Sequence, residues 1–208
     1  MKSKWIVLIV LGAIIVFLFL VGLITISWMN NTYDRAISYQ EEVDQKWGDV
    51  LSQYQRRADL IPNLVNVVKG YAEHEQETLT EVMEARAKAT STTIDPSNLN
   101  TESIQAFQQA QSGLSSALSR LMVVIERYPD LKANQNFLEL QAQLEGTENR
   151  ISVSRMKYNE SVKIYNFHIR GKFRRWALRK FGDEGEFPRK EVFEAVTENV
   201  EQAPKVEF

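Results

Sequence analysis

Near its N-terminus the chain reads IVLIVLGAIIVFLFLVGLITI over residues 6–26, and none of these side chains is charged. A helix of this length, at about 1.5 Å per residue, spans the roughly 30 Å hydrocarbon core of a bilayer. Trp5 and Trp28 bracket the run, at the level where indole rings favour the headgroup layer. Residues 1–29 are therefore predicted to form a transmembrane anchor with a short basic N-terminus.

A retained anchor is favoured over two other interpretations of this run. A cleaved signal peptide has an apolar core of only about 7 to 15 residues, and a small-residue cleavage site follows it. Here Ser27-Trp28-Met29 follows a longer run. A buried core helix would normally carry a polar face, which this run lacks. Because Lys2 and Lys4 precede the run and basic flanks stay cytoplasmic, we expect a single pass with the N-terminus in the cytoplasm.

The rest of the composition favours helices and narrows the function classes. Only nine glycines and five prolines occur in 208 residues. The 25 basic and 27 acidic residues give a net charge of -2, so nucleic acid is not expected as a partner. The chain has no cysteine, which excludes disulfides, thiolate metal sites and cysteine nucleophiles.

Three long segments repeat apolar or small residues at steps of three and four, which is typical of helices packed along a seam. The first is expected to run from near the membrane to residue 89, and the second from Thr101 to Tyr128. The third follows a short connector at Pro129 and is expected to pack antiparallel to the second. We predict an all-α fold, in which a single N-terminal transmembrane helix precedes an elongated antiparallel helical bundle of three long helices and a short C-terminal helix.

Pro62 lies inside the first seam. Because proline lacks a backbone N–H and clashes with the preceding turn, we expect a kink near Leu60, with a clean break into two helices as the alternative. The lost bond frees a carbonyl oxygen near position 58, which a guanidinium or amide from a neighbouring turn or helix is expected to satisfy. Arg57, Asp59 and Asn63 surround the expected kink and are expected to be structural. A ligand or peptide pocket beside the kink is the alternative interpretation of the same groups.

A basic block follows the third helix, with six cations and no acid over residues 170–180: Arg170, Lys172, Arg174, Arg175, Arg179 and Lys180. Phe173 and Trp176 are spaced for one helical face, so residues 170–182 predict a basic amphipathic helix. These side chains are expected to contact anionic lipid, unless the aromatics pack on the end of the bundle and the cations are merely solvated. Residues 183–208 are acidic and aperiodic and predict a loop and a tail, with a short helix from Pro188 as an option.

Neither histidine lies in a metal-binding pattern. A di-iron bundle needs Glu-x-x-His, but Tyr71 precedes His74 and Tyr165 precedes His168 at that spacing. A zinc-protease helix would need a histidine where Thr78 stands. No glycine-rich phosphate loop and no Gly-x-Ser-x-Gly motif occurs. We therefore expect no enzyme activity, no catalytic residue, no metal and no cofactor.

An ordered set of motifs runs along the helical part of the chain: QYQRRADLIPNLV at residues 53–65, VKGYAEHE at 68–75, YPDL at 128–131, LEGTENRI at 144–151, and Tyr-Asn at 158 and again at 165. This set resembles the signature of the LemA family of bacterial membrane proteins, from about residue 33 to residue 166. The positions that carry the resemblance are Arg57, Asp59, Pro62, Asn63, Tyr128, Pro129, Glu148, Arg155, Tyr158, Asn159, Tyr165 and Asn166. Among them, Asn159 and Asn166 are expected to fix helix register as buried amides do.

The resemblance implies one membrane span and an antiparallel bundle, and it implies no reaction. After Asn166 the basic block replaces the short Phe-Pro turn typical of the family. The expected parts are the anchor at 1–29, a LemA-like bundle at 30–169, the basic segment at 170–182 and the tail at 183–208.

We expect a structural or interaction protein of the bacterial inner membrane, with its bundle in the periplasm. Its expected partners are membrane lipid and further copies of itself, with another envelope membrane protein as the alternative. The reason is the length of the first seam, about fifty residues, which exceeds what a second helix of half that length can cover.

Overall fold

The computed structural model describes residues 2–183 and 185–193, and this part of the chain contains six α-helices and no strand. The predicted all-α fold is confirmed. The chain divides into two compact units. Unit 1 comprises Met1–Lys46 and Glu160–Arg189, and unit 2 comprises Trp47–Asn159 and Lys190–Phe208.

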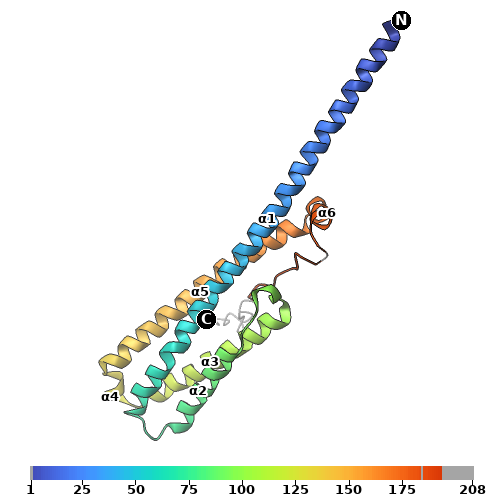
Figure 1. Cartoon of the computed structure of the whole chain (residues 1–208). Helices are drawn as coiled ribbons and strands as arrows, with labels where there is room; N and C mark the ends of the chain where they lie inside the picture. Colours follow the sequence, from blue (N-terminus) through green and yellow to red (C-terminus); the bar gives the residue numbers. More distant parts are fainter. Residues whose placement is uncertain (1, 184, 194–208) are drawn as a thin grey trace, which may run out of the picture. The chain divides into compact units, whose positions relative to one another are not determined.

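Helix α1, Lys2–Lys69, begins with the apolar run (Figure 1). Among the described residues it is the one helix long and apolar enough to cross a membrane. The side chains of residues 8–26 are exposed on every side of the helix, including Phe17 at 65%, Phe19 at 65% and Ile24 at 69%. Apolar surface around a whole helix is unfavourable in water and favourable in lipid, so the run is a candidate transmembrane helix.

The prediction that the first helix reaches residue 89 is wrong, because the chain turns after Lys69 and α2 covers Gln76–Ser91. The backbone N–H groups of Tyr71 and Ala72 donate to the Val68 carbonyl oxygen, at 3.0 and 2.9 Å. Ala72 and Leu79 are buried on either side of the turn, so the apolar spacing continues across the turn and conceals it. The alternative of a clean break at Pro62 is also wrong, because α1 continues through that residue. The kink near Leu60 stays a prediction.

The remaining helices are α3 (Thr101–Ile125), α4 (Pro129–Lys132), α5 (Gln135–Arg170) and α6 (Lys172–Phe181), and a 3-10 turn, η1, covers Pro96–Asn98. A capping box starts α3: the Asn100 side chain accepts from the Ser103 N–H, and the Ser103 hydroxyl accepts from the Asn100 N–H. α2 and α3 lie side by side (Figure 1).

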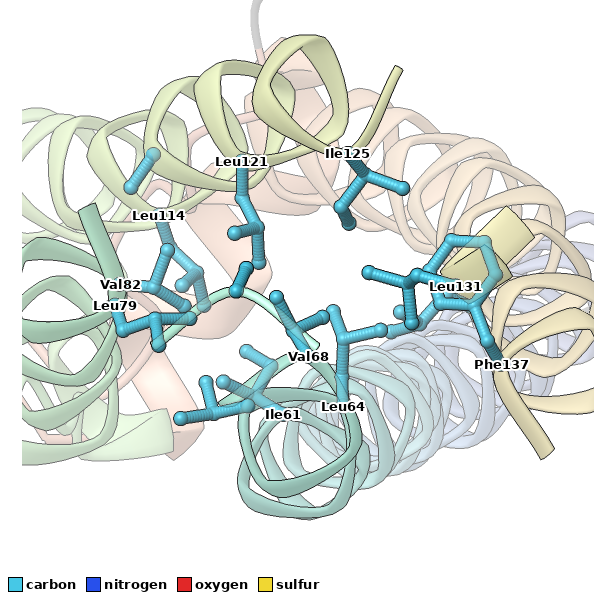
Figure 2. Packing of buried hydrophobic residues seen from close by; sticks show 14 of the residues in the cluster. Ile61, Leu64, Val68, Leu79, Val82, Leu114, Leu121, Ile125, Leu131 and Phe137 are labelled. Atoms are coloured by element: carbon cyan, nitrogen blue, oxygen red, sulfur yellow. The ribbon is translucent and has the colours of Figure 1, made fainter. Parts of the chain in front are cut away.

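The main core of unit 2 lies where α1 meets the helices that follow it. Figure 2 shows side chains from five helices pointing toward one another: Ile61, Leu64 and Val68 from α1, Leu79 and Val82 from α2, Leu114, Leu121 and Ile125 from α3, Leu131 from α4, and Phe137 from α5. The α1 seam is thus buried within the chain itself. The part of the seam around Pro62 therefore offers no uncovered surface for a partner, and the expected self-association stays a prediction.

The C-terminal strap, Lys190–Phe193, is extended and packs into unit 2. Phe193 is 3% exposed and Lys190 is 1% exposed. The Glu191 N–H donates to the Leu99 carbonyl oxygen at 2.9 Å, and the Lys190 ammonium donates to the Pro96 carbonyl oxygen. The optional helix from Pro188 does not form over residues 188–193, which are irregular as expected for a loop and are held by these contacts. Residues 194–208 of the expected tail lie outside the described residues.

Candidate functional site

Arg57 is buried in unit 2 and joins three helices. Its Nη1 donates to Glu148 Oε2 at 2.9 Å and to Ser115 Oγ at 3.1 Å, and its Nη2 donates to Gln111 Oε1 at 2.8 Å. Its side chain is 3% exposed, whereas that of Glu148 is 61% exposed. An ion pair with one solvated partner contributes little by itself, so the main role of Arg57 is to connect α1 with α3 and α5 through directional hydrogen bonds.

The carbonyl oxygen freed by Pro62 belongs to Ala58, and Arg86 of α2 donates its Nε–H to it at 2.6 Å. This donor is a guanidinium from a neighbouring helix, which is the kind of group expected there, and the three polar residues around Pro62 make other contacts. Arg57 makes the bonds described above, Asp59 accepts from Gln55 at 2.7 Å, and Asn63 is exposed. The sequence offered one signal for Arg86, which is a basic residue at a position of the apolar seam.

An aromatic cluster in unit 2 is centred on Trp47. Its ring lies 5.3 Å from that of Phe107, 5.5 Å from that of Tyr158 and 5.7 Å from that of Phe193, with the last pair stacked. The guanidinium of Arg155 lies 4.7 Å from the centre of the Phe193 ring. Two of the residues that carry the family resemblance, Arg155 and Tyr158, therefore contact Phe193 of the C-terminal strap.

Asn159 holds the strap through both of its amide atoms. Its Nδ2 donates to the Phe193 carbonyl oxygen at 3.0 Å, and its Oδ1 accepts from the Phe193 N–H at 2.8 Å. The hydroxyl of Tyr158 donates to the Glu191 carbonyl oxygen at 2.8 Å. Asn159 thus binds extended backbone rather than a neighbouring helix, which corrects the role expected from its pattern.

Hollows open on unit 2 beside Arg57 and beside Ala58. One, of about 510 Å³, is lined by Arg57, Arg155, Glu148 and the serine hydroxyls of α3. The other, of about 570 Å³, includes Ala58 and Asp59 in its lining, one turn before Pro62. Within residues 2–183 and 185–193, no three His, Asp or Glu side chains gather to hold a metal ion.

Tyr128 and Pro129 lie where the chain enters α4. Pro129 occupies the first turn of that helix, where its missing N–H costs nothing. The Tyr128 hydroxyl donates to Glu75 Oε1 at 3.0 Å, and Arg127 pairs with the same carboxylate at 3.0 Å. The hydrogen bond to Glu75 raises the pKa of Tyr128. These contacts tie the turn after α1 to the start of α4.

Tyr165 and His168 are buried on α5 in unit 1. The Tyr165 hydroxyl donates to the Pro188 carbonyl oxygen at 2.9 Å, and burial raises the pKa of Tyr165. His168 Nε2 lies 2.9 Å from the Thr32 carbonyl oxygen and can donate to it, and burial lowers the pKa of His168. Asn166, between them, is half-buried. These residues position α5 against the part of α1 that follows the apolar run.

The basic block forms α6 and the residues that flank it. Phe173 is 80% exposed and therefore does not pack on the rest of unit 1, whereas Trp176, at 49%, is half covered. Arg170, Arg175 and Arg179 line a hollow of about 570 Å³ between α6 and the loop after it. Lys172 and Lys180 are exposed, and the guanidinium of Arg174 lies 5.0 Å from the centre of the Phe167 ring.

A further apolar surface runs along the exposed face of α5, and the sequence interpretation missed it. We call it the α5 face, and its members are spaced by three and four residues: Leu138, Ala142, Gly146, Asn149, Val153 and Met156. Leu138 is 46% exposed, Val153 is 40% exposed and Met156 is 63% exposed. The sequence does contain this second repeat of apolar and small residues on the same helix. The more hydrophobic seam that faces the core conceals it.

Comparison with known proteins places these features in a family. The model of the LemA family matches residues 46–208. Magnetosome protein MamQ 2 of Paramagnetospirillum magneticum is 34% identical over 65 residues, which are 31% of this chain and 24% of that protein. Protein LemA of Metamycoplasma hominis is 23% identical over 130 residues, which are 62% of this chain and 56% of that protein. The matches thus span from a quarter to about half the length of these relatives.

Proposed function

This chain belongs to the LemA family, and we propose that it is a membrane-anchored assembly protein of the bacterial cell envelope whose copies associate through the α5 face. The family, its relatives and the apolar helix support a membrane-associated protein. The proposal includes no catalytic step. The single observation that carries it is the exposed apolar face of α5.

The α5 face has the properties of a helix–helix contact. Its spacing of three and four residues is that of a seam between paired helices. Gly146 lies near its middle, and a Cβ added there would meet no atom within 4 Å. A second helix can therefore approach closely at this point. Exposed apolar side chains arranged in one line, rather than scattered singly, mark an interaction site.

The charges beside the α5 face favour a second copy as the occupant. Glu139 and Lys157 are both exposed and are five helical turns apart, so they lie on the same side of α5. Two α5 helices that pair antiparallel about Glu148 would bring Glu139 of each copy opposite Lys157 of the other. A twofold contact of this kind is self-complementary and closes on itself as a dimer.

Charge reversal tests this pairing. We expect Glu139→Lys and Lys157→Glu each to weaken self-association of the full chain in detergent by about tenfold, since like charges then oppose each other twice per dimer. The double variant should restore association, because it exchanges the two charges. Light scattering coupled to size-exclusion chromatography measures the mass.

Two further variants sharpen the experiment. Glu77→Lys reverses an exposed charge on α2 and should leave the mass unchanged. Val153→Asp should abolish association, because it places a charge in the middle of the apolar face. A wild-type chain that is strictly monomeric at all concentrations, or a double variant as defective as the singles, would reject the α5 face as the interface.

We also propose that the N-terminus is cytoplasmic and that the units beyond the apolar run lie outside the inner membrane. Lys2 and Lys4 before the run support this orientation. The chain lacks cysteine, so single cysteines at Ser3 and at exposed Ser112 can be labelled without background. In intact cells an impermeant maleimide should label position 112 only; labelling of position 3 only would reverse the orientation.

A ligand-binding role is the second candidate, and the hollow beside Arg57 favours it. Arg57, Arg155 and the α3 serines offer donors for a small anion. Dicarboxylates and sugar phosphates added to the purified chain should raise its melting temperature if the hollow binds them. The gain should disappear in Ser116→Leu, which fills the hollow at an exposed position.

A further inference from the structure

We propose that the hollow between α6 and the loop residues 185–189 binds the phosphate headgroup of an anionic membrane lipid. The hollow has a volume of about 570 Å³ and lies within unit 1. Its apolar lining includes Leu178 and Phe187, and four arginines surround it: Arg170, Arg175, Arg179 and Arg189. The proposal rests on the embedding of the apolar run in a bilayer and not on self-association through α5.

The charges in the hollow are unbalanced. Among the described residues that line it, the four arginines outnumber the two carboxylates, Asp183 and Glu186. The Glu186 carboxylate is already occupied, because Oε1 accepts from the Tyr33 hydroxyl at 2.7 Å and Oε2 accepts from the Asp183 N–H at 3.0 Å. The ion pairs formed by the described residues include neither Arg175 nor Arg179. A guanidinium group outside such an ion pair can donate two parallel hydrogen bonds to two oxygens of one phosphate.

The wall opposite α6 is held in place by close packing against α1. The Tyr33 ring meets that of Phe187 edge to face, with the ring centres 5.5 Å apart. A Cβ at Gly182 would lie 3.1 Å from the Tyr33 ring and would clash with the Glu186 carboxylate. Glycine at this position therefore allows the loop to approach α1 and to form the hollow.

The hollow lies close to the end of the apolar run. Tyr33 is seven residues beyond Ile26, which is about 10 Å along a helix, and the headgroup layer of one leaflet is about 5 to 8 Å thick. Within unit 1, Thr32 and Tyr33 contact His168 and Glu186, respectively. When the run is embedded, these contacts place the hollow at the outer edge of the headgroup layer, within reach of the lipid headgroups.

The exposed side of α6 suits the same position. Phe173 and Trp176 are one turn apart on the helix and face outward, with exposed Lys172 and Lys180 beside them. A helix that combines exposed aromatics with cations lies in the headgroup region, where its rings enter the acyl boundary. Single-stranded nucleic acid also binds arginines and aromatics. The proximity to the apolar run favours lipid, and the experiment includes nucleic acid as a competing outcome.

Native mass spectrometry of the full chain in detergent tests the proposal, with phosphatidylglycerol and phosphatidylcholine as the probes. The wild type should bind phosphatidylglycerol at least about tenfold more tightly than phosphatidylcholine, since each cation near an anionic headgroup contributes about fivefold. The variant Arg170→Gln, Arg175→Gln, Arg179→Gln should lose this preference. All three side chains are exposed, so the fold should be unaffected, and Arg179→Gln alone should lose part of the preference.

The matched control removes three exposed cations outside the hollow, as Lys69→Gln, Lys88→Gln, Arg150→Gln, and should retain the preference. Equal binding of the two lipids, or an unchanged preference in the arginine variant, would overturn the proposal. Inorganic phosphate that displaces phosphatidylglycerol at equal concentration would show a site for a soluble anion instead. A single-stranded oligonucleotide that binds more tightly than phosphatidylglycerol would equally reject the lipid.

Discussion

Arg86 donates a hydrogen bond to the carbonyl oxygen of Ala58 at 2.6 Å, and this carbonyl is the one that Pro62 leaves without its helical partner. A side chain of α2 thus completes the hydrogen bonding of α1. The helix tolerates its proline because the neighbouring helix provides the missing donor.

The first prediction concerns this pair. Arg86→Leu should lower the free energy of unfolding by about 1 to 3 kcal/mol, because it leaves a buried carbonyl without a donor. In a Pro62→Ala background, the residue-62 N–H can bond to the Ala58 oxygen, so the same substitution should cost about 1 kcal/mol less. Thermal and urea unfolding followed by circular dichroism measure both. Arg56→Leu, at an exposed position of α1, is the control. Equal costs in the two backgrounds would refute the pairing.

The second prediction concerns the fork that Arg57 forms. Arg57→Lys should destabilise unit 2 by about 2 kcal/mol or more, because lysine cannot bond to Gln111 and Glu148 at the same time. Glu148→Gln should cost less than about 1 kcal/mol, since that side chain is 61% exposed. Urea unfolding of the purified chain gives both values. A lysine variant as stable as the wild type would show that charge alone suffices.

The third prediction concerns the C-terminal strap. Phe193→Ala should lower the free energy of unfolding by about 2 to 4 kcal/mol, because it opens a cavity beside Trp47. The near-ultraviolet circular dichroism of the indole should weaken, since the stacked partner is lost. Val192→Ala, at a residue 37% exposed, should change neither measurement appreciably. Similar behaviour of the two variants would mean that the strap does not hold the cluster.

The fourth prediction concerns pH. Because burial lowers the pKa of His168 below 6.5, the unfolded chain binds a proton more readily than the folded one. Stability should therefore be constant above about pH 6.5 and should decrease as the pH falls through the folded pKa. His168→Gln should remove this slope, whereas His74→Gln, at an exposed position, should retain it. Melting temperatures between pH 8 and pH 5 provide the measurement, and identical slopes in the two variants would contradict the assignment.

The features that the sequence predicted are those that depend on composition or on one regular period. The apolar run stands out because no charge interrupts it, and the α6 helix stands out because its cations and aromatics alternate. The turn at Gly70 was missed because burial on both sides of it preserves the period of the seam. The role of Arg86 was missed because the donor to the Ala58 oxygen comes from a different helix.

The C-terminal strap could not be predicted for a different reason. Phe193 lies in an acidic segment without a period, and its burial depends on Trp47, Tyr158 and Asn159, which are distant in sequence. The α5 face was present in the sequence as a second period, but its significance required knowledge of which side of α5 the core covers.

The contact between Trp47 and Phe193 has a consequence for biosynthesis. Phe193 is made 146 residues after Trp47. The indole of Trp47 therefore lacks its stacked partner until the ribosome has passed residue 193. A nascent chain that stalls before this residue would leave one face of the ring open to chaperones and proteases, so the cluster closes only once the strap has been made.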